Sequence, residues 1–278
     1  RKLHWGVNRS TSHITIRDNE ITGIRAQGYD RAIYVFRVDD FRLEDNYFHD
    51  CPQMRGAAAH TAERPVFRNN RLERMGRTPL TFFNTRDGRI IGNRIENNTG
   101  THSNGLSVYE GSRDTLIEGN IVRNSNIALT LNRATNAIIR NNVFDGGGRN
   151  QPISFWENVT GEVVVEHNTL INGGKASGLY LGGLGDRDGR SFAGLRLIVR
   201  NNIMDGPVQH IMRGSNPIWT QDIENRHNLY RAAPAAFVPG PGERVIEDFE
   251  SLFRDFRAGD YRLRPGSPAI DAGQPGGT

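Results

Sequence analysis

A short phrase recurs nine times along the chain and constrains its fold more than any other feature. Each copy has a few β-forming residues, a charged or polar residue, then asparagine, any residue and an apolar residue. The landmark asparagines are Asn19, Asn46, Asn70, Asn93, Asn120, Asn142, Asn168, Asn202 and Asn228. They lie 22 to 34 residues apart with strand-like segments between them. This pattern excludes helical repeats, whose units are longer and helix-rich.

These repeats predict an all-β parallel solenoid of about eight to nine rungs, each built from two or three short strands. Asparagine at a fixed corner tolerates the left-handed backbone conformation, and its amide can hydrogen-bond to the amide of the next rung. We place the β-helix in residues 1–230. Because solenoid ends need covering, we expect residues 231–278 to form a C-terminal cap or strap within the same domain.

The predicted cap contains a run of apolar residues at helical spacing. These residues are Val245, Phe249, Leu252, Phe253 and Phe256. Their spacing predicts a short helix or an irregular strap over the last rung. No comparable cap precedes the first rung, so the chain is expected to be a monomer or to self-associate through its N-terminal rung.

A second strand in each turn alternates apolar and other residues, which predicts its inward and outward faces. The inward pairs are Ile33/Val35, Leu80/Phe82, Leu106/Val108, Leu129/Leu131, Ile153/Phe155 and Leu179/Leu181. The outward side chains include an aromatic set: Tyr34, Phe36, Phe83, Tyr109, Trp156 and Tyr180. Such a row, about 4.8 Å per rung, is a natural floor for sugar rings. The alternative is that the rings stack only on one another.

The Asn-marked turns, together with the run GDYRLRPGSPAIDAG at 259–273, resemble the right-handed parallel β-helix superfamily of pectate lyases, polygalacturonases, alginate lyases and mannuronan epimerases. The resemblance implies a right-handed helix that acts on a polysaccharide. It also implies a secreted or periplasmic bacterial protein, although no export signal is present in this chain. The epimerase DPHD motif and the paired-aspartate polygalacturonase motif are absent. Lys175 falls in a turn and is a poor match for a lysine base.

The outward face carries groups suited to acid–base chemistry on a uronic acid. His60 or His102 is the expected base and Tyr109 the expected proton donor. Arg133, Asn132 or Arg86 is expected to neutralise the substrate carboxylate. We therefore favour a lyase or C5-epimerase on an acidic glycan, which binds along the aromatic row.

Two other functions remain open. Glu110 and Glu157 each follow an outward aromatic residue two rungs apart, roughly 9–10 Å along the stack. Inverting glycosidases separate their carboxylates by about 6.5–9.5 Å, so a glycoside hydrolase is one alternative. The other is a glycan-binding β-helix without catalysis.

The amino-acid composition limits the classes of partner that the chain can bind. All but two of the 35 basic residues are arginine, whose planar guanidinium suits carboxylates. These arginines form no dense stripe, which argues against nucleic acid. No apolar run is long enough for a membrane span. No cofactor is expected, although calcium could bind among Asp39, Asp40, Asp186 and Asp188.

Overall fold

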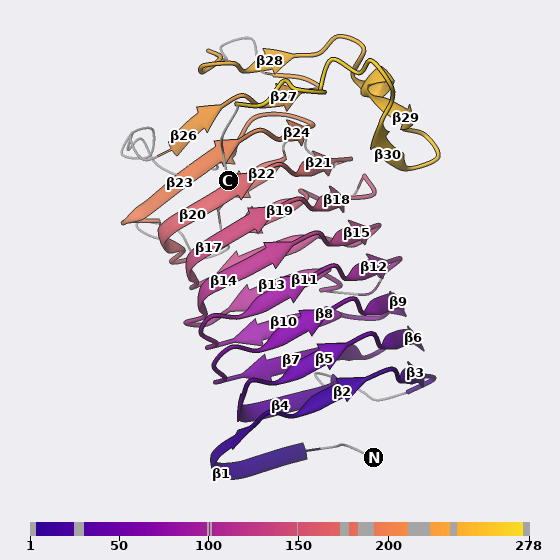
Figure 1. Ribbon diagram of the computed structural model, residues 1–278, viewed down its shortest axis with the longest axis vertical. Helices are drawn as coiled ribbons and strands as arrows, with labels where there is room; N and C mark the ends of the chain where they lie inside the picture. The colour runs from indigo at the N-terminus through magenta and orange to yellow at the C-terminus, as the bar shows by residue number, and fades with distance from the viewer. Residues whose placement is uncertain are drawn as a thin grey trace.

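The chain winds into a parallel β-helix whose rungs stack along one axis (Figure 1). The computed structural model describes residues 4–24, 31–98, 100, 102–148, 150–172, 178–182, 192–210, 223–233 and 238–274. Each turn adds one strand to each of three sheets, and consecutive turns pair in parallel. The prediction of an all-β parallel solenoid is confirmed. No helix among the described residues is long and apolar enough to cross a membrane.

Sheet A contains β1 (His4–Ser12), β4 (Arg31–Asp39), β7 (Arg55–His60), β10 (Leu80–Phe83), β13 (Leu106–Tyr109), β16 (Leu129–Asn132), β19 (Ile153–Phe155), β22 (Leu179–Leu181) and β25 (Gln209–His210). Sheet B contains β2 (Thr15–Arg17), β5 (Arg42–Glu44), β8 (Val66–Arg68), β11 (Arg89–Ile91), β14 (Arg113–Glu118), β17 (Thr135–Arg140), β20 (Thr160–Glu166), β23 (Leu195–Arg200) and β26 (Ile223–Arg226). Sheet C contains β3 (Glu20–Thr22), β6 (Tyr47–Cys51), β9 (Arg71–Met75), β12 (Arg94–Glu96), β15 (Ile121–Arg123), β18 (Val143–Asp145), β21 (Thr169–Ile171), β24 (Ile203–Met204), β27 (Leu229–Tyr230) and β28 (Arg244–Val245).

The hydrophobic core fills the space between the three sheets. Each strand of sheet A sends alternate side chains inward because successive residues of a strand face opposite ways. The six predicted inward pairs, from Ile33/Val35 to Leu179/Leu181, are at most 7 % exposed, so this prediction is confirmed. Burial of each such side chain contributes about 1.5–3 kcal/mol. The core fixes which side chains of sheet A must face outward.

A ladder of asparagine side chains runs along the corner between sheets B and C. The Nδ2 of each landmark asparagine donates to the Oδ1 of the next, at 2.9–3.0 Å, from Asn19 through to Asn228. The last Nδ2, that of Asn228, donates to the carboxylate of Glu243 at 3.0 Å. The predicted amide-to-amide bonding is therefore confirmed along nine asparagines.

The left-handed backbone predicted for these asparagines is wrong by one residue. The residue before each of them has a φ of 53° to 65°. These residues are Asp18, Asp45, Asn69, Gly92, Gly119, Asn141, His167, Asn201 and His227. The sharp turn is made there, which leaves the next side chain pointing into the stack, where it reaches both neighbouring rungs.

The C-terminal segment lies beside the upper rungs of sheet C (Figure 1). It contains the 3₁₀ helix η2 (Phe249–Leu252) and the antiparallel pair β29 (Phe253–Asp255) and β30 (Asp260–Leu263). Its aromatic cluster packs on Ile171 and on other outward side chains of sheet C. Val245, expected with this cluster, instead lies in strand β28 and is 47 % exposed, because β28 extends sheet C beside β27.

Candidate functional site on sheet A

The outward side chains of sheet A form two columns rather than one row. The first column is Tyr34, Ala58, Thr81, Ser107, Thr130, Ser154 and Tyr180. The second is Phe36, His60, Phe83, Tyr109 and Asn132, followed by Trp156 one residue beyond β19. Small residues occupy the middle of the first column and are at most 2 % exposed. These small side chains therefore form a floor that is shielded from solvent, beside the aromatic rings of the second column.

His60 lies at the centre of the aromatic part of this face. Its Nδ1 is 2.5 Å from the hydroxyl oxygen of Tyr34, one rung below. Phe36 and Phe83 flank the imidazole, with ring centroids at 5.1 and 5.7 Å. Burial lowers the pKa of His60, and the cation of Arg31 lowers it further. His60 is therefore neutral at pH 7 and able to accept a proton.

Arg31 supplies positive charge beside this histidine. Its guanidinium lies 5.2 Å from the Tyr34 ring centroid and 5.1 Å from that of Phe83. Burial lowers its pKa, as does Arg55, its partner in register on the next strand. Arginine nevertheless stays charged in proteins. Among the described residues no carboxylate pairs with Arg31, and its Nε is buried without a hydrogen-bond acceptor.

Tyr109 covers the middle of the floor. Its ring contacts Phe83 at 5.7 Å and stacks on Trp156 at 6.1 Å. The Asn104 amide donates to its hydroxyl at 3.4 Å and to Thr130 at 3.0 Å. Burial raises the pKa of Tyr109. The phenol therefore stays protonated at neutral pH and can act as a proton donor.

The other predicted polar residues lie around this centre with differing roles. The His102 side chain is exposed, and its backbone carbonyl accepts a hydrogen bond from Thr78. Arg86 lines a cavity of about 330 Å³ at the turn between sheets A and B. Arg133 forms an ion pair with Glu157 at 3.3 Å. Neither arginine contacts the His60 cluster in the part of the chain that the structure describes.

The remaining predicted residues lie at the ends of the outward columns. Glu110 is exposed just beyond Tyr109, and its charge partly offsets the lowering of the His60 pKa. Asn132 is in register with Tyr109, and its Oδ1 is buried without a hydrogen-bond donor. Tyr180 ends the first column, and burial raises its pKa.

The sequence comparison decides the family. Residues 6–144, half of the chain, match the family model described as "Right handed beta helix region". The chain belongs to the right-handed β-helix family. A search of curated proteins gave no match.

Three solved structures align with most of this chain at low sequence identity. The pectate lyase Pel9A has a TM-score of 0.51 and 13 % identity, with 94 % of this chain and 82 % of that chain covered. The A-module of the mannuronan C-5 epimerase AlgE6 from Azotobacter vinelandii has a TM-score of 0.49 and 17 % identity, with 85 % and 73 % covered. XylC in complex with xylose has a TM-score of 0.49 and 13 % identity, with 77 % and 38 % covered.

The sequence predicts that calcium could bind among Asp39, Asp40, Asp186 and Asp188. Among the described residues, no three His, Cys, Asp or Glu side chains converge as metal ligands. Asp40 instead pairs with Arg64 at 2.8 Å, and Asp39 accepts a hydrogen bond from the backbone of Glu63. Asp186, Asp188 and Lys175 lie outside the described residues.

Sequence reasoning missed Arg31 and Arg55. Both open a strand of sheet A two residues before its first inward side chain, and the strands pair Arg31 with Arg55. Aligning the repeats on their inward pairs would have placed both arginines at the same position of consecutive rungs. The alternation rule gave no such signal, because it describes strand interiors and not the corner where the strand begins.

Proposed function

We propose that this chain is a polysaccharide lyase or C5-epimerase that acts on an acidic, uronic-acid-containing glycan. The observation that carries the proposal is the hydrogen-bonded Tyr34–His60 pair beside the half-buried cation of Arg31. A neutral base next to an unneutralised cation, among aromatic rings, suits removal of a proton next to a carboxylate. The family's β-helix scaffold, shared with a pectate lyase, is compatible with this chemistry, but one scaffold hosts many reactions.

The first requirement of the reaction is to make the C5 proton acidic. Negative charge develops on the carboxylate as that proton leaves, so a nearby cation lowers the barrier. Arg31 would take this role, with Arg55 on the next rung beside it. Arg133, the neutraliser expected from the sequence, is less suited because Glu157 already pairs with it.

In the proposed reaction His60 removes a proton and Tyr109 donates one. In the proposed arrangement His60 donates its Nδ1–H to the oxygen of Tyr34, which leaves Nε2 free to take the C5 proton. In a lyase the electron pair then forms the C4=C5 double bond as the C4–O bond breaks. Tyr109, which stays protonated, gives its proton to the leaving oxygen. In an epimerase a proton returns to C5 from the opposite face instead.

A glycoside hydrolase that uses Glu110 and Glu157 is less well supported. Glu157 is already engaged in an ion pair with Arg133 at 3.3 Å, and no described contact brings it together with Glu110. A binding module without catalysis would use the same aromatic rings but has no need of a half-buried cation beside a neutral histidine.

The test compares His60→Gln and Tyr34→Phe with wild type on pectate, alginate and glycosaminoglycan substrates. Ultraviolet absorbance reports the double bond, reducing ends report chain cleavage, and proton NMR reports epimerisation. Both variants are expected to lose turnover, His60→Gln by about 10²–10⁴-fold. His49→Gln, which changes a histidine on sheet C, is the matched control and should keep full activity. Reducing ends without absorbance, abolished by Glu157→Gln, would replace the proposal with hydrolysis.

A further inference from the structure

Two cavities lie side by side along the edge of sheet C where its strands end. The upper cavity, of about 770 Å³, lies between this edge and the C-terminal β29–β30 hairpin. The lower one, of about 740 Å³, extends along the rungs below. Asn97 and Asn124 line both cavities, so the two form one continuous edge groove. Each volume lies within the range usual for ligand sites, about 300–1,000 Å³.

The floor of the edge groove is a polar repeat. Consecutive rungs place there Asp50, Arg74, Asn97, Asn124, Gly147 and Asn172. All six have a φ between 48° and 59° and lie near the end of a sheet C strand or just beyond it, with Gly147 one residue further along its rung than the others. Their spacing is therefore about 4.8 Å per rung, close to the length of one pyranose unit. At Gly147 a Cβ would lie 3.0 Å from Asn124, so glycine keeps the groove open.

The outer wall of the upper cavity is held in place by hydrogen bonds. Arg123 donates to the carbonyl oxygen of Gly259 at 2.6 Å. The Tyr261 hydroxyl donates to Asp145, and Asn172 donates to both of these groups at 3.0 Å. A ligand would meet a preformed cleft and would not have to order the hairpin.

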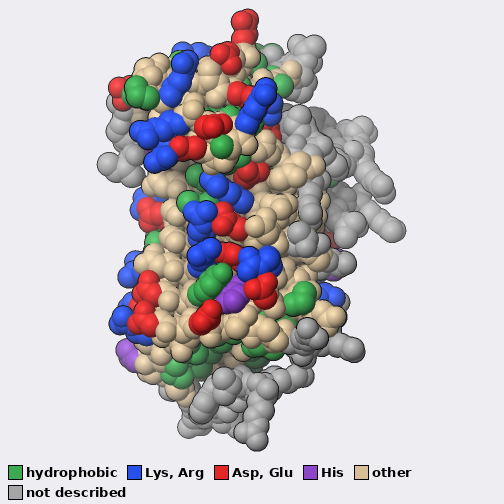
Figure 2. All heavy atoms as spheres, turned by 90° about the vertical axis from the view of Figure 1, so that its right-hand side faces the viewer, with side chains coloured by type: hydrophobic (Ala, Val, Ile, Leu, Met, Phe, Trp, Pro, Cys, Tyr) green, Lys and Arg blue, Asp and Glu red, His purple; other side chains and the backbone are tan. Residues whose placement is uncertain are grey.

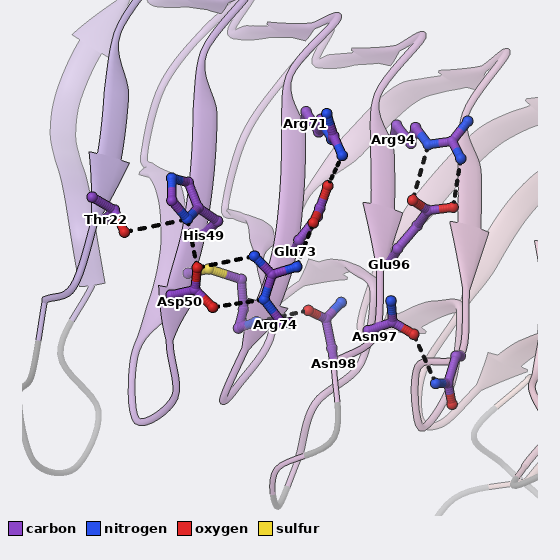
Figure 3. Close-up of polar contacts among 12 residues, drawn as sticks. Thr22, His49, Asp50, Arg71, Glu73, Arg74, Arg94, Glu96, Asn97 and Asn98 are labelled. Carbon is purple, nitrogen blue, oxygen red and sulfur yellow. Dashed lines mark hydrogen bonds and ion pairs between the residues drawn. The ribbon is translucent and has the colours of Figure 1, made fainter.

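Most of the charges in the edge groove are already paired with one another, and Asp145 is hydrogen-bonded to Tyr261 and Asn172. Arg74 forms a two-pronged pair with Asp50 at 2.6 and 2.9 Å (Figure 3). Glu250 pairs with Arg231 at 3.0 Å and with Arg257 at 3.3 Å. Figure 2 shows acidic and basic side chains interleaved on this face of the molecule. A charged glycan would have to break such pairs, whereas sugar hydroxyls can bond to them as they stand.

The two asparagines at the junction are suited to hydroxyl groups. Asn124 donates one amide hydrogen to the Asn97 oxygen at 2.9 Å, a bond drawn in Figure 3. This leaves the NH₂ of Asn97 as a donor and the oxygen of Asn124 as an acceptor. A sugar hydroxyl both donates and accepts, so it can satisfy the two amides together. The aromatic side chains of Phe256 and Tyr261 also line the upper cavity.

We infer that the edge groove is a second binding site, for an uncharged polysaccharide chain that lies along the axis of the β-helix. This site is separate from the sheet A face and does not depend on catalysis there. It would hold the protein on a neutral glycan while the sheet A face meets an acidic one.

The test measures binding of xylan, mixed-linkage β-glucan and galactomannan by affinity electrophoresis, and of their oligosaccharides by calorimetry. The variant is Asn97→Gly/Asn124→Gly, because glycine tolerates the positive φ at both positions. The matched control is Asn69→Gly/Asn141→Gly, two exposed positive-φ asparagines outside both cavities. At least one probe should bind wild type and the control equally, and the groove variant at least tenfold more weakly.

The outcomes separate this inference from the proposed function. Loss of neutral-glycan binding in the groove variant, with uronate turnover unchanged, supports the edge groove. The same loss would support it even if no uronate were turned over by wild type. If no neutral probe binds wild type, the inference is overturned. It is also overturned if the groove variant binds normally while His60→Gln does not, since the site would then be on sheet A.

Discussion

The outer face of sheet A and the edge of sheet C are built on the same stacked rungs but treat charge in opposite ways. On sheet A, Arg31 is half-buried against aromatic rings, and this burial lowers its pKa. On sheet C, Arg74 is hydrogen-bonded to Asp50 and Glu73, which raises its pKa. One guanidinium lacks a counter-charge among the described residues, whereas the other has two. An anionic ligand would therefore gain more binding energy beside Arg31 than beside Arg74, because of these two cations only Arg31 lacks a paired carboxylate among the described residues.

His60 on sheet A and His49 on sheet C show the same contrast between the two faces. Burial lowers the pKa of His60, whereas hydrogen bonds from His49 to Asp50 and Glu20 raise its pKa. His60 therefore stays neutral at pH 7, whereas His49 is set to hold a proton between two carboxylates. A repeat scaffold can thus place one residue type in two chemical states on two faces.

The most direct way to break the contrast is to remove the unmatched cation. Arg31→Gln should lower kcat on the uronate substrate by about 10²–10³-fold, because a positioned donor to developing charge is lost. Arg71→Gln, which removes an exposed and paired arginine of sheet C, is the control and should leave kcat unchanged. Equal activity of the two variants would remove Arg31 from the proposed mechanism.

A second approach weakens the scaffold that both faces share. Asn120 is fully buried, and its side chain bonds to Asn93, Asn142 and the carbonyl of Ile90. Asn120→Ala should lower the free energy of unfolding by about 3 kcal/mol, since it leaves several buried partners unsatisfied. Asn19→Ala at the exposed end of the ladder should cost clearly less. Urea denaturation measures both, and equal losses would contradict an internal role for the ladder.

Titration by NMR sharpens the comparison of the two histidines. His60 should titrate below the ordinary value of 6.5, and His49 above it. Arg31→Gln should move the pKa of His60 upward, because the arginine cation lowers it in wild type. The pKa of His49 should not change in that variant. An unshifted His60 would mean that Arg31 does not act on it.

The smallest expected effect concerns the stability of the sheet C edge. The pKa of His49 is raised on folding, so its contribution is fully present below pH 6.5 and is lost as pH rises through the folded pKa. His49→Gln should therefore lower Tm more at about pH 5 than at about pH 8. Surface pairs of this kind contribute up to about 1 kcal/mol. A Tm difference that does not vary with pH would contradict the charged pair.

The fold could be predicted from the sequence because its determinants are local and periodic. The asparagines and inward pairs recur once per rung, so the ladder and the core follow from one alignment. The site could be predicted only in part. His60 and Tyr109 were placed on sheet A, but the Tyr34–His60 contact joins different rungs and depends on side-chain direction. The pairing of Arg133 with Glu157 also depends on the direction of side chains from different rungs, which the sequence does not give.

The asparagine ladder also gives the whole solenoid an electrical direction. Every ladder amide turns its N–H toward the C-terminal end and its oxygen toward the N-terminal end, so the amide dipoles add along the axis. Peptide dipoles add in the same way in an α-helix, whose positive end favours anions. Here the positive end meets the buried carboxylate of Glu243. The β-helix therefore ends its dipole on a carboxyl group of its own, which accepts the last hydrogen bond of the ladder.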